Sequence, residues 1–362
     1  MNLVTSHSKT PRVRANPKVT AADVRATEIV DLTPTATAGR HATYTARMAD
    51  SGEQVFVKHA ALENLFKGRM GQKLNQPMAQ AMQSTFPHLD RFQDMADVML
   101  SHFAKAYFNE QGRRYSGVTY SEVLARKAQG ENKLLIAAPM VEHLGTLQDV
   151  PVTQVTNGAE AVEGTLLKGL ILGDYDVSLN NSNNTLALED GHLSDGTPLQ
   201  KGQVVMMDYG EAGNANHRWL GMPYGSVALL TQFPQHIQPA IENILKLDDK
   251  KIRQLVEQGG QQVTGWNDTL TDHFTRNLEK NLDKLRQEYA RDPDQFDPRN
   301  SPNPLRHPEH AERKMYVTFP RGLANYASLK MSGVLNGVPD NQETADQIAA
   351  LLPPWPGSHS TN

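Results

Sequence analysis

The sequence contains no cysteine. This absence excludes a disulfide scaffold, a cysteine-ligated zinc or iron–sulfur site and a cysteine nucleophile. Long apolar runs are lacking too, since the longest, 134–141, has the size of a strand and falls far short of the ~20 residues that cross a bilayer. An excess of charge of one sign is also lacking, because 36 Lys and Arg stand against 40 Asp and Glu and leave a net charge of −4. We therefore expect a soluble protein without a transmembrane segment and with no nucleic-acid partner.

The chain has the composition of a globular protein. Hydrophobic residues make up 38% of its 362 residues, and this length predicts roughly two domains or lobes. Residues 1–25 are poor in acids and rich in Ser and Thr, without the apolar stretch of a Sec signal peptide. We expect a disordered tail there, or a leader for a dedicated secretion apparatus, so that the protein is either cytoplasmic or secreted. The Pro-rich residues 351–362 should form a flexible tail.

Hydrophobic spacing predicts a small sheet followed by a mainly helical region, an α+β class. The expected strands of the sheet are 28–32, 42–48, 54–58 and 133–141. Between the last two strands, residues 62–112 have the spacing of a long helical insert, and 119–129 is typical of a short helix. Further helices are expected at 162–172, 237–247, 251–258 and 269–291, with two short strands at 185–188 and 204–207.

One set of polar residues carries a chemical signal. Asn181 follows Asp176 by five residues, and Asp208 begins an Asp-Tyr-Gly sequence that comes after the two short strands. Phosphoryl transfer needs such a set, because one carboxylate orients the substrate hydroxyl while an amide oxygen and a second carboxylate hold Mg²⁺ against the nucleotide phosphates. We expect the short strands to bring these groups to the mouth of one cleft, and Gly210 to let the chain turn sharply away from it.

Residues 173–181 follow the frame Gly-Asn-x-Asp-Arg-His-x-x-Asn, with Asp176 and Asn181 in register. On these residues the sequence resembles the atypical branch of the protein-kinase-like superfamily, which includes phosphoinositide kinases, HipA-type toxin kinases and bacterial effector kinases. The resemblance implies that Asp176 is the catalytic carboxylate and that Asn181 and Asp208 are magnesium ligands. It also implies a bilobal fold with a small antiparallel sheet in an N-lobe (26–145, including the insert) and a mainly helical C-lobe (146–350).

Two further stretches are similar to parts of that family. Val-Phe-Val-Lys at 55–58 resembles the strand whose lysine binds the α- and β-phosphates, which implies this role for Lys58. Residues 140–147 resemble a kinase hinge, so backbone groups near Glu142 and Leu144 would meet the adenine. Glu122 is the candidate for the ion pair that positions Lys58, and Gly39 with Arg40 would lie in the phosphate-binding loop.

The sequence departs from the family pattern at three places. Val177 and Ser178 replace the Arg-His pair, the loop around Gly39 has a single glycine, and no Ala-Pro-Glu follows Asp-Tyr-Gly. Asp174 is a rival to Asp176, but only Asp176 gives the five-residue step to Asn181.

These residues together predict an ATP- and Mg²⁺-dependent kinase. The expected substrate is a protein Ser/Thr hydroxyl on a host or cellular target, in the manner of a bacterial effector or toxin-type kinase. Three alternatives stay open. The same fold could phosphorylate a phosphoinositide or another small alcohol, it could be a pseudokinase that binds a partner without transfer, or it could transfer AMP.

Overall fold

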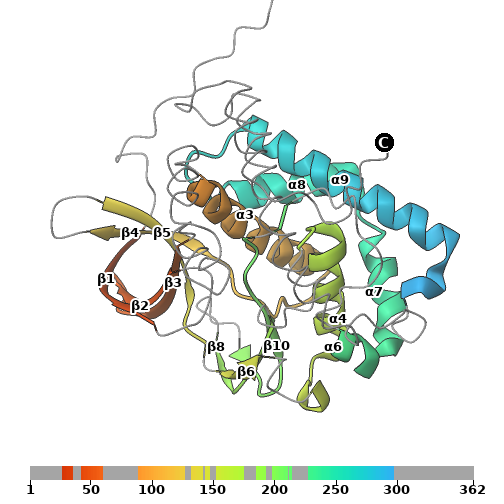
Figure 1. Ribbon diagram of the computed structural model, residues 1–362, viewed down its shortest axis with the longest axis horizontal. Helices are drawn as coiled ribbons and strands as arrows, with labels where there is room; N and C mark the ends of the chain where they lie inside the picture. The colour runs from red at the N-terminus through yellow and green to blue at the C-terminus, as the bar shows by residue number, and fades with distance from the viewer. Residues whose placement is uncertain are drawn as a thin grey trace, which may run out of the picture.

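The computed structural model describes residues 27–35, 42–59, 89–126, 132–141, 143–146, 152–174, 185–192, 198–210, 212–213 and 227–296. They form a mixed α/β fold in which a small β-barrel lies beside a mainly helical part (Figure 1). The mixture of helices and strands predicted from the sequence is confirmed. Both expected tails, 1–25 and 351–362, lie outside the described residues. In the described part of the chain, no helix combines the length and apolar character needed to cross a membrane.

Five strands close into a barrel in the order β1-β2-β3-β5-β4. They are β1 (Thr27–Pro34), β2 (Ala42–Met48), β3 (Gln54–His59), β4 (Ser121–Arg126) and β5 (Asn132–Pro139). Alternate side chains point inward and form a buried cluster of Ile29, Ala46, Val55, Val57, Val123, Ala125, Leu135 and Ala137. Neighbouring strands are antiparallel except β1 and β4, whose parallel pairing closes the barrel. The expected purely antiparallel sheet is thus wrong in one pairing, and the closure removes the open edges that a small sheet would expose.

Helix α3 (Leu89–Glu110) connects β3 to β4 and packs against α8 (Asp249–Gly260) and β5. Its buried side includes Met95, Met99 and Phe103. The spacing of these apolar residues is the pattern that predicts a helix from the sequence. Helix is therefore confirmed for this part of the expected 62–112 insert, whereas residues 60–88 lie outside the described ones.

Strand β4 corrects the expected helix at 119–129. Val123 and Ala125 point into the barrel, and Glu122 lies on the outer face in one row with Ile136 of β5 and Lys58 of β3. Three consecutive apolar residues at 123–125 fit a helix or a buried strand equally well. Pairing with β1 on one side and β5 on the other decides for the strand.

After β5 the chain enters a second, three-stranded sheet in the order β10-β7-β6. Its strands are β6 (His143–Thr146), β7 (Thr185–Leu188) and β10 (Val204–Met206), and the last two confirm the two short strands expected from the sequence. A two-stranded ribbon, β8 (Gly191–His192) with β9 (Pro198–Leu199), separates β7 from β10 along the chain. Through this sheet, the residues that follow β10 come to lie at the end of the helical part that faces the barrel.

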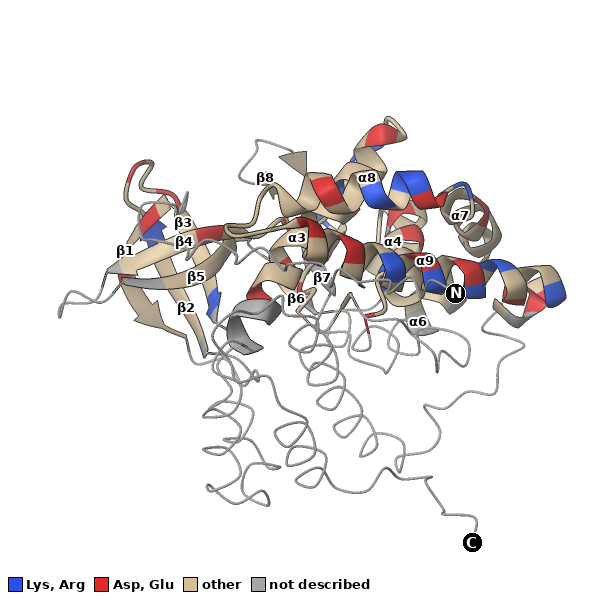
Figure 2. Ribbon diagram, turned by 90° about the horizontal axis from the view of Figure 1, so that it is seen from above, with Lys and Arg blue, Asp and Glu red and all other residues tan. Residues whose placement is uncertain are grey.

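The helical part agrees with the four helices expected beyond residue 160. It contains η2 (Val152–Gln154), α4 (Gly158–Leu166), the π-helical turn η3 (Leu167–Ile171), α6 (Val227–Gln232), η6 (Pro234–His236), α7 (Ile237–Ile244), α8, α9 (Asp268–Arg291) and η7 (Pro293–Phe296). Side-chain caps set two of the starts. Asp248 accepts from the backbone N–H of Lys251 at α8, and Asn267 accepts from that of Leu270 at α9. Basic and acidic residues are interspersed along α8 and α9 (Figure 2), which is typical of solvated helix faces.

Candidate active site

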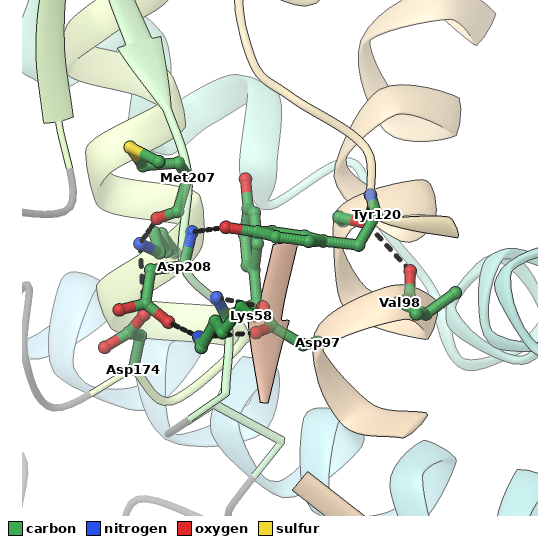
Figure 3. Close-up of polar contacts among 10 residues, drawn as sticks. Lys58, Asp97, Val98, Tyr120, Asp174, Met207 and Asp208 are labelled. Carbon is green, nitrogen blue, oxygen red and sulfur yellow. Dashed lines mark hydrogen bonds and ion pairs between the residues drawn. The ribbon is translucent and has the colours of Figure 1, made fainter. Parts of the chain in front are cut away.

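The site is built around Lys58, near the end of β3. Alternation along the strand sends Val55 and Val57 into the barrel and Lys58 outward, toward α3. The Lys58 Nζ lies 2.6 Å from Oδ2 of Asp97 and also contacts Oδ1 of Asp208 (Figure 3). Lysine usually keeps its ammonium in water, yet this side chain is 5% exposed. An ammonium buried beside two carboxylates is the kind of arrangement found at functional sites.

Asp97 of α3 joins Lys58 to the Asp-Tyr-Gly segment. One carboxylate oxygen contacts Lys58, and the other accepts a hydrogen bond from the backbone N–H of Tyr209. Sequence reasoning missed Asp97 because it treated this helix as an insert. The available signal was Asp97 itself, an acid three residues after Asp94 in a stretch of mostly apolar residues. In the structure, all of residues 94–100 are buried.

Asp208 lies two residues after β10 and has a left-handed backbone, with φ of 61°. Such a conformation costs a non-glycine residue about 1–3 kcal/mol and persists only where the surroundings fix it. The backbone N–H of Asp208 donates to the hydroxyl of Tyr120, at 3.3 Å. Its side chain is 35% exposed, against 5% for Lys58 and 1% for Asp97. Asp208 is therefore the member of the cluster through which the site reaches solvent.

The turn expected at Gly210 is present, because the N–H of Ala212 donates to the carbonyl oxygen of Tyr209, at 2.9 Å. The φ of Gly210 is not left-handed, unlike that of Gly213. A Cβ at Gly210 would stand 3.4 Å from both Lys58 Nζ and Asp97 Oδ2. The glycine therefore lets the backbone pass directly beside the ion cluster without a side chain between them.

Burial and charge act in opposite directions on the cluster. Burial alone lowers the pKa of Lys58, but the carboxylates of Asp208 and Asp97 outweigh it and hold that pKa well above its ordinary value. Burial raises the pKa of Asp97 to about 6, against the opposing effect of Lys58 and with a further rise from Asp208. Lys58 is thus held in its charged form between the two carboxyl groups.

A second buried ion pair lies beside the same segment. Lys168 of η3 has its Nζ 3.2 Å from Oδ2 of Asp174 and donates a hydrogen bond to the carbonyl oxygen of Met207. Both charged side chains are 1% exposed. Asp174, the rival to Asp176 for the catalytic carboxylate, is thus buried and paired with an ammonium.

Of the predicted site residues, the structure brings Lys58 and Asp208 together and places Glu122 elsewhere. The Glu122 carboxylate accepts a hydrogen bond of 2.7 Å from the backbone N–H of Thr264. The expected ion pair between Lys58 and Glu122 is therefore wrong, and Asp97 provides the carboxylate instead. On the barrel surface Ile136 stands between Lys58 and Glu122 in the same row, which holds the two side chains apart.

The remaining predicted residues give less information. Leu144 lies in β6, at the point where its register with β7 shifts between His143 and Gly145. The predictions for Gly39, Arg40, Glu142, Asp176 and Asn181 fall outside the described residues.

The donors of this site suit magnesium. Mg²⁺ prefers hard oxygen ligands and is commonly held by one or two carboxylates together with substrate phosphates. Asp208 offers a partly exposed carboxylate of this kind. Among the residues that the structure describes, no three His, Asp or Glu side chains form a cage of their own.

No protein-family model matches the chain, and no curated protein sequence matches it.

Proposed function

We propose that the protein is an ATP- and Mg²⁺-dependent phosphotransferase with a bilobal, protein-kinase-like fold. In this proposal the barrel is the core of the N-lobe and the helical part is the C-lobe, with the cleft between them. The proposed substrate is a Ser or Thr hydroxyl of a protein.

The observation that carries the proposal is the meeting of Lys58, Asp97 and Asp208. The three residues come from a barrel strand, from the helix that follows it and from the Asp-Tyr-Gly segment after the second sheet. Phosphoryl transfer from ATP uses these parts in this order, a strand lysine, a helix carboxylate that pairs with it and a carboxylate for the metal. The order of elements around the site, five barrel strands with a helix after the third, supports the same reading.

Each residue has a defined part in the proposed reaction. Lys58, oriented by Asp97, binds the phosphates of ATP, while Asp208 and Asn181 hold the metal. Bound Mg²⁺ supplies neutralisation of phosphate charge. Asp176 accepts the proton of the substrate hydroxyl as its oxygen bonds to the γ-phosphorus and the bond to the β-phosphate oxygen breaks, which releases ADP. The protein contributes position and charge and forms no covalent bond to the substrate.

The test is transfer of labelled γ-phosphate from ATP to protein substrates, followed by mass spectrometry of the product. Asp208→Asn, Asp208→Ala and Asp176→Ala should each lower transfer at least a hundredfold, because a metal ligand or the hydroxyl-orienting group is lost. Asp31→Asn is the matched control, since Asp31 also has a left-handed backbone, with φ of 57°, but lies on the exposed surface of β1.

The outcomes separate the proposal from its alternatives. Full transfer by Asp208→Ala would overturn the site assignment. An AMP adduct in place of a phosphate would show nucleotidyl transfer, and label on a phosphoinositide alone would make the protein a lipid kinase. Thermal stabilisation by Mg²⁺-ATP without turnover on any substrate would identify a binding module.

A further inference from the structure

Met207, Asp208 and Tyr209 each have a backbone group that is hydrogen-bonded to a side chain from another part of the chain. Lys168 of η3 donates to the carbonyl oxygen of Met207, the hydroxyl of Tyr120 accepts from the N–H of Asp208, and Asp97 of α3 accepts from the N–H of Tyr209. These contacts fix the left-handed backbone of Asp208 on both sides. Lys168 provides the contact that precedes Asp208.

Burial of the Lys168 ammonium requires its removal from water, and a gain in stability is not sufficient to explain why a lysine stands here. Its side chain is 1% exposed, and its ammonium lies 4.7 Å from the centre of the Tyr209 ring as well as beside Asp174. A buried ion pair is weak evidence for stability, because well-packed apolar side chains of similar size often replace such a pair without loss. Lys168 also lies in a π-helical turn, a local widening of a helix that is frequent at functional sites.

We propose that Lys168, oriented by Asp174, is a positioning residue that holds Met207–Tyr209 so that the Asp208 carboxylate faces Lys58. The role rests on the proposed function, in which Asp208 is a metal ligand. Asp174 keeps the ammonium in place and balances its charge, and the Met207 carbonyl receives the hydrogen bond that fixes the backbone. Lys168 takes no part in the chemistry and touches neither nucleotide nor metal.

The experiment compares three variants with the wild-type chain. Lys168→Met removes the donor and takes the ammonium away from the buried Asp174 carboxylate. Lys168→Met combined with Asp174→Asn removes both charges, so that stability recovers relative to the single variant while the Met207 carbonyl still lacks its donor. Arg113→Met with Glu163→Gln is the matched control, because it removes another ion pair with a buried carboxylate in the helical part.

Hydrogen exchange of the Asp208 and Tyr209 amides provides a readout that does not depend on activity. In the double variant of Lys168 and Asp174 these amides should exchange at least about tenfold faster, while the control exchanges there at the wild-type rate. In parallel, the Mg²⁺ concentration for half-maximal phosphate transfer should rise at least about tenfold, with the KM for ATP at saturating Mg²⁺ changing much less.

Unchanged exchange at the two amides would overturn the positioning role. Faster exchange with wild-type turnover and wild-type Mg²⁺ dependence would overturn it as well, because the segment would then be held for stability alone. If the wild-type chain itself transfers no phosphate, the proposed function fails, and the exchange measurement still decides whether Lys168 holds the segment.

Discussion

At the scale of single residues, the cluster around Lys58 couples its charge to pH. Asp97 has a pKa of about 6 in the folded chain, above the 3.8 of an unperturbed aspartate. A carboxyl group whose pKa is higher in the folded than in the unfolded chain binds its proton more tightly when folded. Its contribution to the free energy of unfolding is therefore largest below pH 3.8 and falls as the pH rises to about 6.

This sign gives a prediction for Asp97→Asn. As the pH rises from 4 to 7, the wild-type chain should lose up to about 3 kcal/mol of stability relative to the variant, because only the wild type has to ionise a buried carboxyl group. Urea unfolding of both proteins at half-unit steps of pH measures the difference. Parallel pH profiles for the two proteins would contradict the assignment of this titration to Asp97.

The residues that sequence reasoning found and missed differ in how local their signals are. Lys58 ends an alternating strand and Asp208 begins a short motif, so neighbouring residues mark both. Asp97 and Lys168 have no such motif. Each lies in an apolar helix, and its role exists only because the fold brings Met207–Tyr209 beside it.

At the scale of elements, α8 fixes the helix that carries Asp97. A Cβ at Gly259 of α8 would stand 2.4 Å from the carbonyl oxygen of Met99, two residues after Asp97. The glycine thus permits close contact between the two helices. The sequence predicted both helices as amphipathic elements, but apolar periodicity does not say which helices pack together, and the contact between α3 and α8 could not be predicted.

Gly259→Ala should therefore move α3 and disturb the Lys58–Asp97 pair. We expect a loss of about 1–3 kcal/mol in stability from overpacking and a KM for ATP raised severalfold, measured by thermal unfolding and steady-state kinetics. Gly164→Ala in α4 is the matched helical control, because the atoms nearest to its Cβ would belong to the flexible Met206 side chain, at 3.3 Å, and not to backbone. Equal behaviour of the two variants would show that the contact at Met99 does not control the site.

At the scale of the whole molecule, polar contacts tie the barrel to the helical part. The barrel has its own apolar interior, and a separate cluster fills the helical part. Lys58 connects them through Asp208, and Glu122 connects them through the backbone N–H of Thr264, between α8 and α9. The order of the elements was predictable from the sequence except at β4, where a helix was expected. These long-range contacts join residues more than a hundred positions apart and carry no local pattern.

The two contacts should differ in what they contribute. Glu122→Ala leaves the Thr264 N–H without this acceptor and should lower the free energy of unfolding by about 1–3 kcal/mol, while turnover at a temperature well below unfolding stays within about threefold of wild type. Lys58→Met should instead lower turnover at least a hundredfold, because the phosphates lose their ammonium. Thermal unfolding and initial rates of both variants separate stability from catalysis. Lys250→Met, on the exposed face of α8, is the control. A loss of turnover in Glu122→Ala as large as in Lys58→Met would mean that Glu122 acts on Lys58 after all, and that the barrel and helical part are coupled through the reaction site and not merely held together.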